Sequence, residues 1–118
     1  MRPETAGCIA DALLAAERIT ECLAEVDQDQ YAVDWKLQSI VERQFLILGE
    51  AAIRVRDLDP PVFSQLAEGD SIIRFRNLLV HVYNQIDARR VFEIAQEELP
   101  GLIVVLEALV DQARKQGL

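Results

Sequence analysis

Apolar residues recur every three or four positions along most of the chain, which is the period of an amphipathic helix. Over residues 6–26 they form one continuous stripe, with glutamates on the opposite face. The polar segment 27–30 interrupts this pattern. A second apolar stripe then predicts a long helix from residue 33 or 34 to residue 56. The sequence has no strand-like alternation, so the pattern indicates an all-helical protein.

Prolines, glycines and aspartates divide the second half of the chain into shorter helices. The run Asp-Pro-Pro at residues 59–61 ends the second helix and begins a short one over residues 61–67. Gly69 is expected to end that piece, and Asp70 or Ser71 to cap a third long helix over residues 71–85.

Two further signals complete the predicted fold. Asp87 is expected to cap a fourth helix, and Pro100 with Gly101 to kink or split it before a final segment, residues 102–114. We therefore predict an all-α fold: a compact, antiparallel up-and-down bundle of four to five helices, forming a single domain over residues 1–118.

Composition and charge restrict the possible partners. No apolar run is long enough to span a membrane and no signal peptide is evident, so we expect a cytoplasmic protein. The net charge of -8 argues against broad binding to nucleic acid, and we expect neither DNA nor a membrane as a partner. Residues 54–90 are locally different, with six arginines against five acidic residues, which leaves room for a small basic site.

The two cysteines do not indicate a metal site or a disulfide. Cys8 and Cys22 lie in one predicted helix, about 20 Å apart along its axis, too far to bridge each other. Neither has a Cys-x-x-Cys partner or a nearby histidine, so we expect no metal ion and interpret both as small buried apolar residues.

The predicted helix 71–85 carries an unusual line of polar residues. At about 100° per residue, Asn77, His81 and Asn84 lie within roughly 60° of one another, and Arg76 and Tyr83 lie on an adjoining strip. The apolar residues between them are expected to pack into the bundle: Leu78, Leu79 and Val82.

These side chains suit phosphate-ester chemistry. Arginine matches phosphate oxygens, and histidine exchanges protons near neutral pH. RNA cleavage needs no metal ion if the 2′-hydroxyl is the nucleophile, but one His81 cannot easily make both proton transfers, whereas two copies in a dimer could. The simpler alternatives stay open: Arg76 could pair with a carboxylate, and Tyr83 could be a core aromatic residue.

The octapeptide RNLLVHVY at residues 76–83 resembles the Arg-x4-His-x-Tyr signature of HEPN-domain ribonucleases, in the HepT toxin branch. Residues 42–51, with their Gly-Glu-Ala stretch, and residues 87–102 are similar to other segments of that branch. The resemblance covers at least residues 35–110.

The resemblance implies a HEPN-like helical bundle that forms a homodimer and cleaves RNA without a cofactor, with Arg76 and His81 as catalytic residues. Asn77 would support them, and Asn84, which shares their polar line by spacing, is expected to do the same. The expected partner is an MntA-like minimal nucleotidyltransferase, an antitoxin that attaches AMP to the motif tyrosine, here Tyr83. The rival hypotheses are a non-catalytic module that holds a nucleotide or the nucleotidyltransferase, and a plain dimeric scaffold.

Three residues outside the octapeptide also need an explanation. Gly49 lies inside a predicted helix, where glycine costs about 1 kcal/mol relative to alanine, so either another helix approaches closely or Gly49 belongs to the site. Glu50 could pair with Arg54 on the next turn or reach the cleft and orient Arg76. Trp35 is expected to be a packing or interface residue.

Overall fold

The computed structural model describes residues 1–81 and 86–118, and this part of the chain forms helices without strands. Five helices have ten or more residues and two are short. In chain order they are α1 (Pro3–Leu23), α2 (Gln28–Val33), α3 (Trp35–Leu58), α4 (Pro60–Phe63), α5 (Gly69–His81), α6 (Ala88–Glu97) and α7 (Leu99–Lys115). The all-α prediction is confirmed, and the predicted four to five helices correspond to the longer ones.

Aspartate side chains begin four of these helices. Asp34 caps α3, Asp59 caps α4 and Asp87 caps α6, each accepting a hydrogen bond from a backbone N–H of the first turn. Asp27 forms a capping box with Gln30. The polar segment 27–30, expected only as a break, therefore starts the additional helix α2.

The boundary between α4 and α5 differs from the prediction. The short helix ends at Phe63, and Gly69 begins α5 instead of ending the piece before it. A Cβ atom on Gly69 would lie 2.8 Å from Cε1 of Phe63, so the glycine is needed where the Phe63 ring packs against the backbone. Close packing, and not helix termination, explains this glycine.

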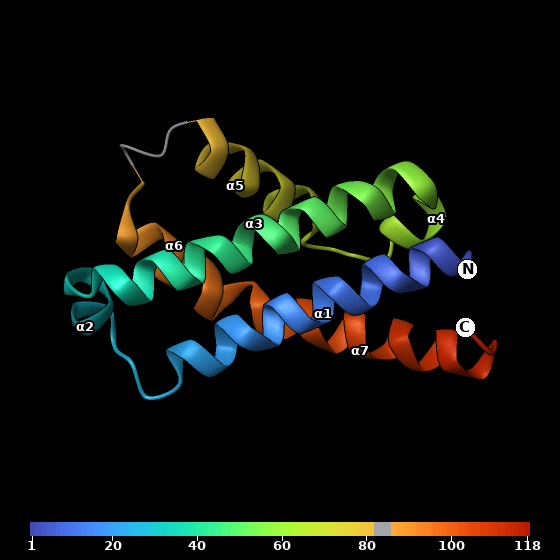
Figure 1. Cartoon of the computed structure of the whole chain (residues 1–118), viewed down its shortest axis with the longest axis horizontal. Coiled ribbons are helices and arrows are strands. Elements are labelled where there is room, and N and C mark those ends of the chain that lie inside the picture. The colour runs from blue at the N-terminus through green and yellow to red at the C-terminus, as the bar shows by residue number, and fades with distance from the viewer. Residues whose placement is uncertain (82–85) are drawn as a thin grey trace.

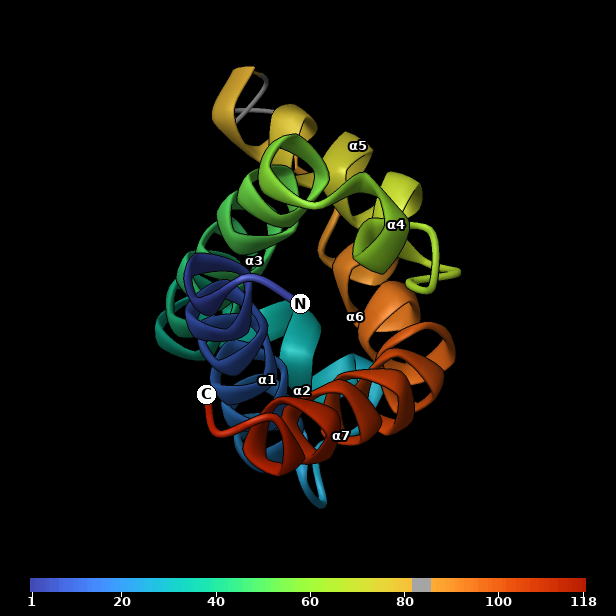
Figure 2. The same ribbon diagram turned by 90° about the vertical axis from the view of Figure 1, so that its right-hand side faces the viewer.

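The long helices run antiparallel to their neighbours. α1 lies against both α3 and α7, and α5 lies against α3, with the chain direction reversing at each of these contacts (Figure 1). Figure 2, which looks along the bundle, shows α1 flanked by α3 and α7, while α6 closes the opposite side. As predicted, the chain breaks between α6 and α7, where Pro100 occupies the first turn of α7.

One apolar core joins the helices. Its largest fully buried side chains come from six of them: Ile9, Ile19, Tyr31, Phe45, Leu48, Ile72, Val91, Leu99, Leu106 and Leu109. Cys8 is buried and Cys22 half-buried, and both are free thiols within the described residues, in agreement with their interpretation as apolar residues. Trp35, by contrast, is 70% exposed.

No helix in residues 1–81 or 86–118 is long and apolar enough to cross a membrane.

Candidate functional site

The motif helix α5 is fixed by its apolar face. Ile72, Ile73, Phe75 and Leu79 are buried against the bundle. The ring of Phe75 packs edge-on against that of Phe45 in α3, with centroids 5.0 Å apart, a geometry that contributes about 0.5–1.5 kcal/mol beyond burial. Leu78 is 45% exposed, so the prediction that it packs into the bundle is wrong; it lies 100° round the helix from the buried Leu79.

Gly49 of α3 allows α5 to approach at the position of Arg76. A Cβ atom added to Gly49 would lie 2.2 Å from Cβ of Arg76 and 2.5 Å from its Cγ. Nonbonded carbon atoms in proteins essentially never come this close, so any larger residue would force the two helices apart. The prediction of a close helix approach is confirmed, and the residue approached is the motif arginine itself.

The guanidinium of Arg76 is held by two side chains. Its Nη2 donates to Oε2 of Glu50 at 3.1 Å, and its Nη1 donates to Oδ1 of Asn77 at 3.0 Å. Glu50 therefore reaches Arg76 and, within the described chain, makes no ion pair with Arg54. The Glu50 side chain is 55% exposed, so solvent screens this pair and its main effect is on orientation.

The held guanidinium keeps hydrogen-bonding capacity. Arginine carries five N–H donors, and the contacts with Glu50 and Asn77 use two of them. The side chain of Arg76 is still 26% exposed. An oriented, charged group with donors to spare can bind a phosphate oxygen.

His81 is the last described residue of α5 and is exposed. It follows Arg76 by five residues, which on a regular helix is about 7.5 Å of rise and a rotation of about 140°. The guanidinium and the imidazole of one copy thus leave the helix in different directions. Val82 and the predicted site residues Tyr83 and Asn84 lie outside the described residues.

A groove runs beside Arg76, between α1, α3 and α5. Its volume is about 460 Å³, and α5 contributes Arg76 and Val80 to its wall. On the α3 side it is lined by Arg43, Gln44, Leu46, Ile47, Glu50, Ala51 and Arg54, and on the α1 side by Asp11, Leu14, Ala15 and Arg18. In the described part of the chain, no group of three or more histidine, cysteine, aspartate or glutamate residues is arranged to hold a metal ion.

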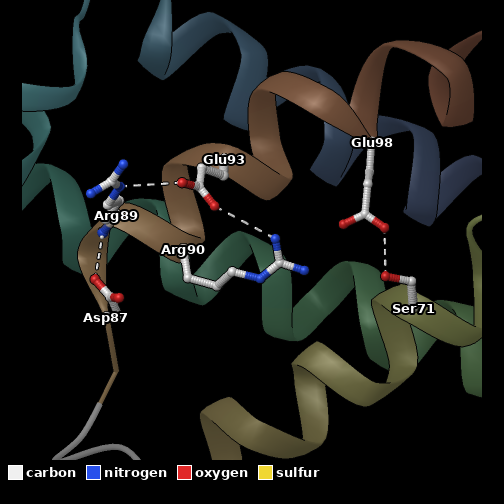
Figure 3. A network of polar contacts seen from close by, with 6 residues as sticks. All are labelled: Ser71, Asp87, Arg89, Arg90, Glu93 and Glu98. Carbon is white, nitrogen blue, oxygen red and sulfur yellow. Dashed lines mark hydrogen bonds and ion pairs between the residues drawn. The ribbon is translucent and has the colours of Figure 1, made fainter.

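A second polar cluster links α5 to the α6–α7 junction (Figure 3). The hydroxyl of Ser71 donates to a carboxylate oxygen of Glu98, and Glu93 of α6 accepts from Arg89 at 3.3 Å. A hydrogen bond with Glu98 raises the pKa of Glu68, and burial and the charge of Glu98 add to this effect. The sequence indicates Ser71 only as a possible helix cap and does not reveal this link, because the partner of Ser71 is 27 residues away.

Comparison with known proteins assigns the chain to a family. The family described as Ribonuclease HepT-like matches residues 12–109. Searches of curated proteins and of solved structures give no match. The matched range contains the groove residues on α3, the arginine on α5 and the histidine that follows it. Because the match covers most of the chain, the protein belongs to the HepT-like ribonuclease family.

Proposed function

We propose that the protein is a cytoplasmic, metal-independent endoribonuclease and the toxin of a HepT/MntA toxin–antitoxin pair. The observation that carries the proposal is the guanidinium of Arg76, held by Glu50 and Asn77 at the edge of a groove, five residues before an exposed His81. Membership of a ribonuclease family supports RNA as the substrate.

The chemistry requires three tasks at the scissile phosphate. A base removes the proton of the RNA 2′-hydroxyl, the 2′-oxygen bonds to phosphorus, and the bond from phosphorus to the 5′-oxygen breaks. An acid protonates the departing 5′-oxygen, leaving a 2′,3′-cyclic phosphate and a 5′-hydroxyl. Arg76 stabilises the negative charge that develops on the phosphoryl oxygens, and His81 exchanges the protons.

A homodimer supplies the second imidazole. In one copy, Arg76 and His81 point in directions about 140° apart, and one histidine cannot act as base and acid in the same step. In a two-fold dimer with facing motif helices, both copies contribute to one cleft: one neutral His81 takes the proton of the 2′-hydroxyl, and the other, protonated His81 donates a proton to the departing 5′-oxygen.

Regulation by AMP attachment is the second part of the proposal. Tyr83 follows His81 by two residues, and an MntA-like minimal nucleotidyltransferase is the proposed antitoxin that modifies it. The added phosphates would compete with RNA for Arg76 and repel the RNA backbone. The support for this part is the family's motif, which the chain carries intact.

Cleavage of RNA in EDTA tests the proposed activity. The wild type should cleave, His81→Ala should lower kcat by about 10²–10⁴, as expected for loss of general acid–base catalysis, and Arg76→Ala should also be severely impaired. Arg74→Ala is the matched control, because Arg74 lies exposed on the same helix and makes no ion pair in the described chain.

Two outcomes would contradict the activity. If His81→Ala cleaves as fast as the wild type, a contaminating nuclease is responsible. If a folded, dimeric wild type cleaves no RNA, the chain is a binding module that holds a nucleotide or the nucleotidyltransferase. Circular dichroism and light scattering on each variant separate loss of chemistry from loss of fold.

A further inference from the structure

The groove beside Arg76 concentrates positive charge on an acidic protein. Four of its thirteen lining residues are arginines, Arg18, Arg43, Arg54 and Arg76, against two carboxylates, Asp11 and Glu50. The groove thus carries a net charge of two positive, while the whole chain carries -8. Such local concentration of one sign attracts an anionic ligand that the rest of the surface repels.

Three of these arginines make no ion pair within the described residues. Among residues 1–81 and 86–118, Arg18, Arg43 and Arg54 are exposed and take part in no ion pair. Elsewhere most arginines are paired, as Arg89 and Arg90 are with Glu93. These groove arginines can therefore bind an external anion without first breaking an ion pair in the described part of the chain.

The arginines are spread along the groove. Arg43 and Arg54 are eleven residues apart on α3, which places them within about 20° on one face and about 16 Å apart along the axis. Arg18 lines the groove from α1 and Arg76 from α5. Because α5 runs antiparallel to α3 (Figure 1), the His81 end of α5 points toward the Arg43 end of the groove.

Apolar and neutral polar groups lie between the charges. Leu14 and Val80 are 47% and 42% exposed, and together with Ile47 they give the groove an apolar surface. Gln44 also lines the groove and is a neutral polar residue. Apolar side chains suit the faces of nucleobases, and a carboxamide is a group that can hydrogen-bond a base edge or a ribose hydroxyl.

We propose that this groove is a binding track for single-stranded RNA, in which Arg18, Arg43 and Arg54 bind phosphates that flank the scissile one. The inference rests on the proposed ribonuclease function and extends it from Arg76 and His81 to a substrate path. A single strand alternates phosphates with bases, which matches arginines separated by apolar surface better than a compact anion does. An acidic face of a second copy is the competing occupant, and the experiment distinguishes the two.

RNA binding tests the track independently of cleavage. The background is His81→Ala, so that a fluorescent single-stranded RNA of about twelve nucleotides stays intact while its anisotropy is measured. Adding R18Q, R43Q and R54Q should weaken binding about a hundredfold at 0.1 M salt and reduce the slope of log K against log salt by about 2. The matched control carries R56Q, R89Q and R114Q. These substitutions remove the same number of positive charges as the groove substitutions, but the three arginines lie outside the groove, in surface ion pairs.

Cleavage by the active protein provides the second measurement. The groove substitutions should raise KM much more than they lower kcat, and their effect on kcat/KM should shrink as the RNA is shortened to a dinucleotide. The control substitutions should change both constants little.

The possible results separate the track from the proposed function. Equal loss of RNA affinity in the groove and control variants, or loss in neither, overturns the track even if the wild type cleaves RNA. A groove variant that becomes monomeric by light scattering shows instead that this face joins two copies, and the track is then wrong. If RNA binding depends on the groove arginines but the wild-type protein never cleaves RNA, the groove is an RNA-binding site and the proposed ribonuclease function is wrong.

Discussion

The closest link between sequence and site is the contact of Gly49 with Arg76. A glycine inside a long helix is unfavourable by itself, and here it is retained at the point where α5 comes nearest to α3. The next residue, Glu50, accepts a hydrogen bond from the guanidinium of Arg76, whose side chain packs against Gly49. Two consecutive residues of α3 thus set both the depth and the orientation of one side chain on α5.

Replacement of Gly49 by alanine should destabilise the protein. The added methyl group would overlap Arg76, and overpacking of this kind costs about 1–3 kcal/mol, more than the gain of up to about 1 kcal/mol in helix propensity. Urea unfolding would measure the change. Gly7→Ala in α1 is the matched control, because nothing lies within 4 Å of its added Cβ, and it should be neutral or stabilising. Equal midpoints for the two variants would refute the close approach.

Tyr83 is the residue that should carry the AMP. After co-expression with a cognate MntA-like nucleotidyltransferase, intact mass should rise in AMP-sized steps, and RNA cleavage should fall as the added phosphates repel the substrate. Tyr83→Phe should show no rise. Tyr31→Phe is the control: Tyr31, the other tyrosine, is fully buried, so its loss should leave the mass shift unchanged. A shift that survives in Tyr83→Phe would place the modification elsewhere.

At the scale of elements, the sequence predicts those helices and helix boundaries that depend on interactions between residues close in the chain. Apolar spacing of three and four positions marks the long helices, and aspartates such as Asp59 and Asp87 mark helix starts, because a cap bonds to its own first turn. The extra helix α2 was missed because its capping box, Asp27 with Gln30, consists of polar residues that resemble a loop. Gly69 was assigned to a helix end because its true partner, Phe63, is recognised only from the packed structure.

The site shows the same division between local and distant interactions. The octapeptide places Arg76, Asn77 and His81 on one helix, and spacing alone relates them to one another. The sequence does not decide whether Glu50 pairs with Arg54 or with Arg76, since only tertiary packing determines which guanidinium the carboxylate reaches. The groove arginines on α1 and α3 went unnoticed for the same reason: Arg18 and Arg43 are separated in sequence and meet only when the helices pack.

At the scale of the whole molecule, the acidic surface favours selective binding over strong binding. With a net charge of -8, the chain as a whole repels RNA, so affinity should depend mainly on the few arginines of the locally basic region that make contact. The substrate would then be held beside Arg76 and little elsewhere. If AMP is attached at Tyr83 as proposed, the added negative charge would weaken this binding effectively.

The composite site proposed above predicts how activity depends on the mixture of subunits. If each working cleft needs His81 from both copies, co-refolding wild type with an equal amount of His81→Ala should leave about a quarter of the activity of the same total amount of wild type, because only wild-type homodimers are active. Independent protomers would leave about half. Mixing with Arg114→Gln, a surface variant at the far end of α7, should cause no loss and controls for refolding. A linear dependence on the wild-type fraction, or a monomer in light scattering at micromolar concentration, would show that one copy suffices and that a second proton-transfer group must be sought within the same chain.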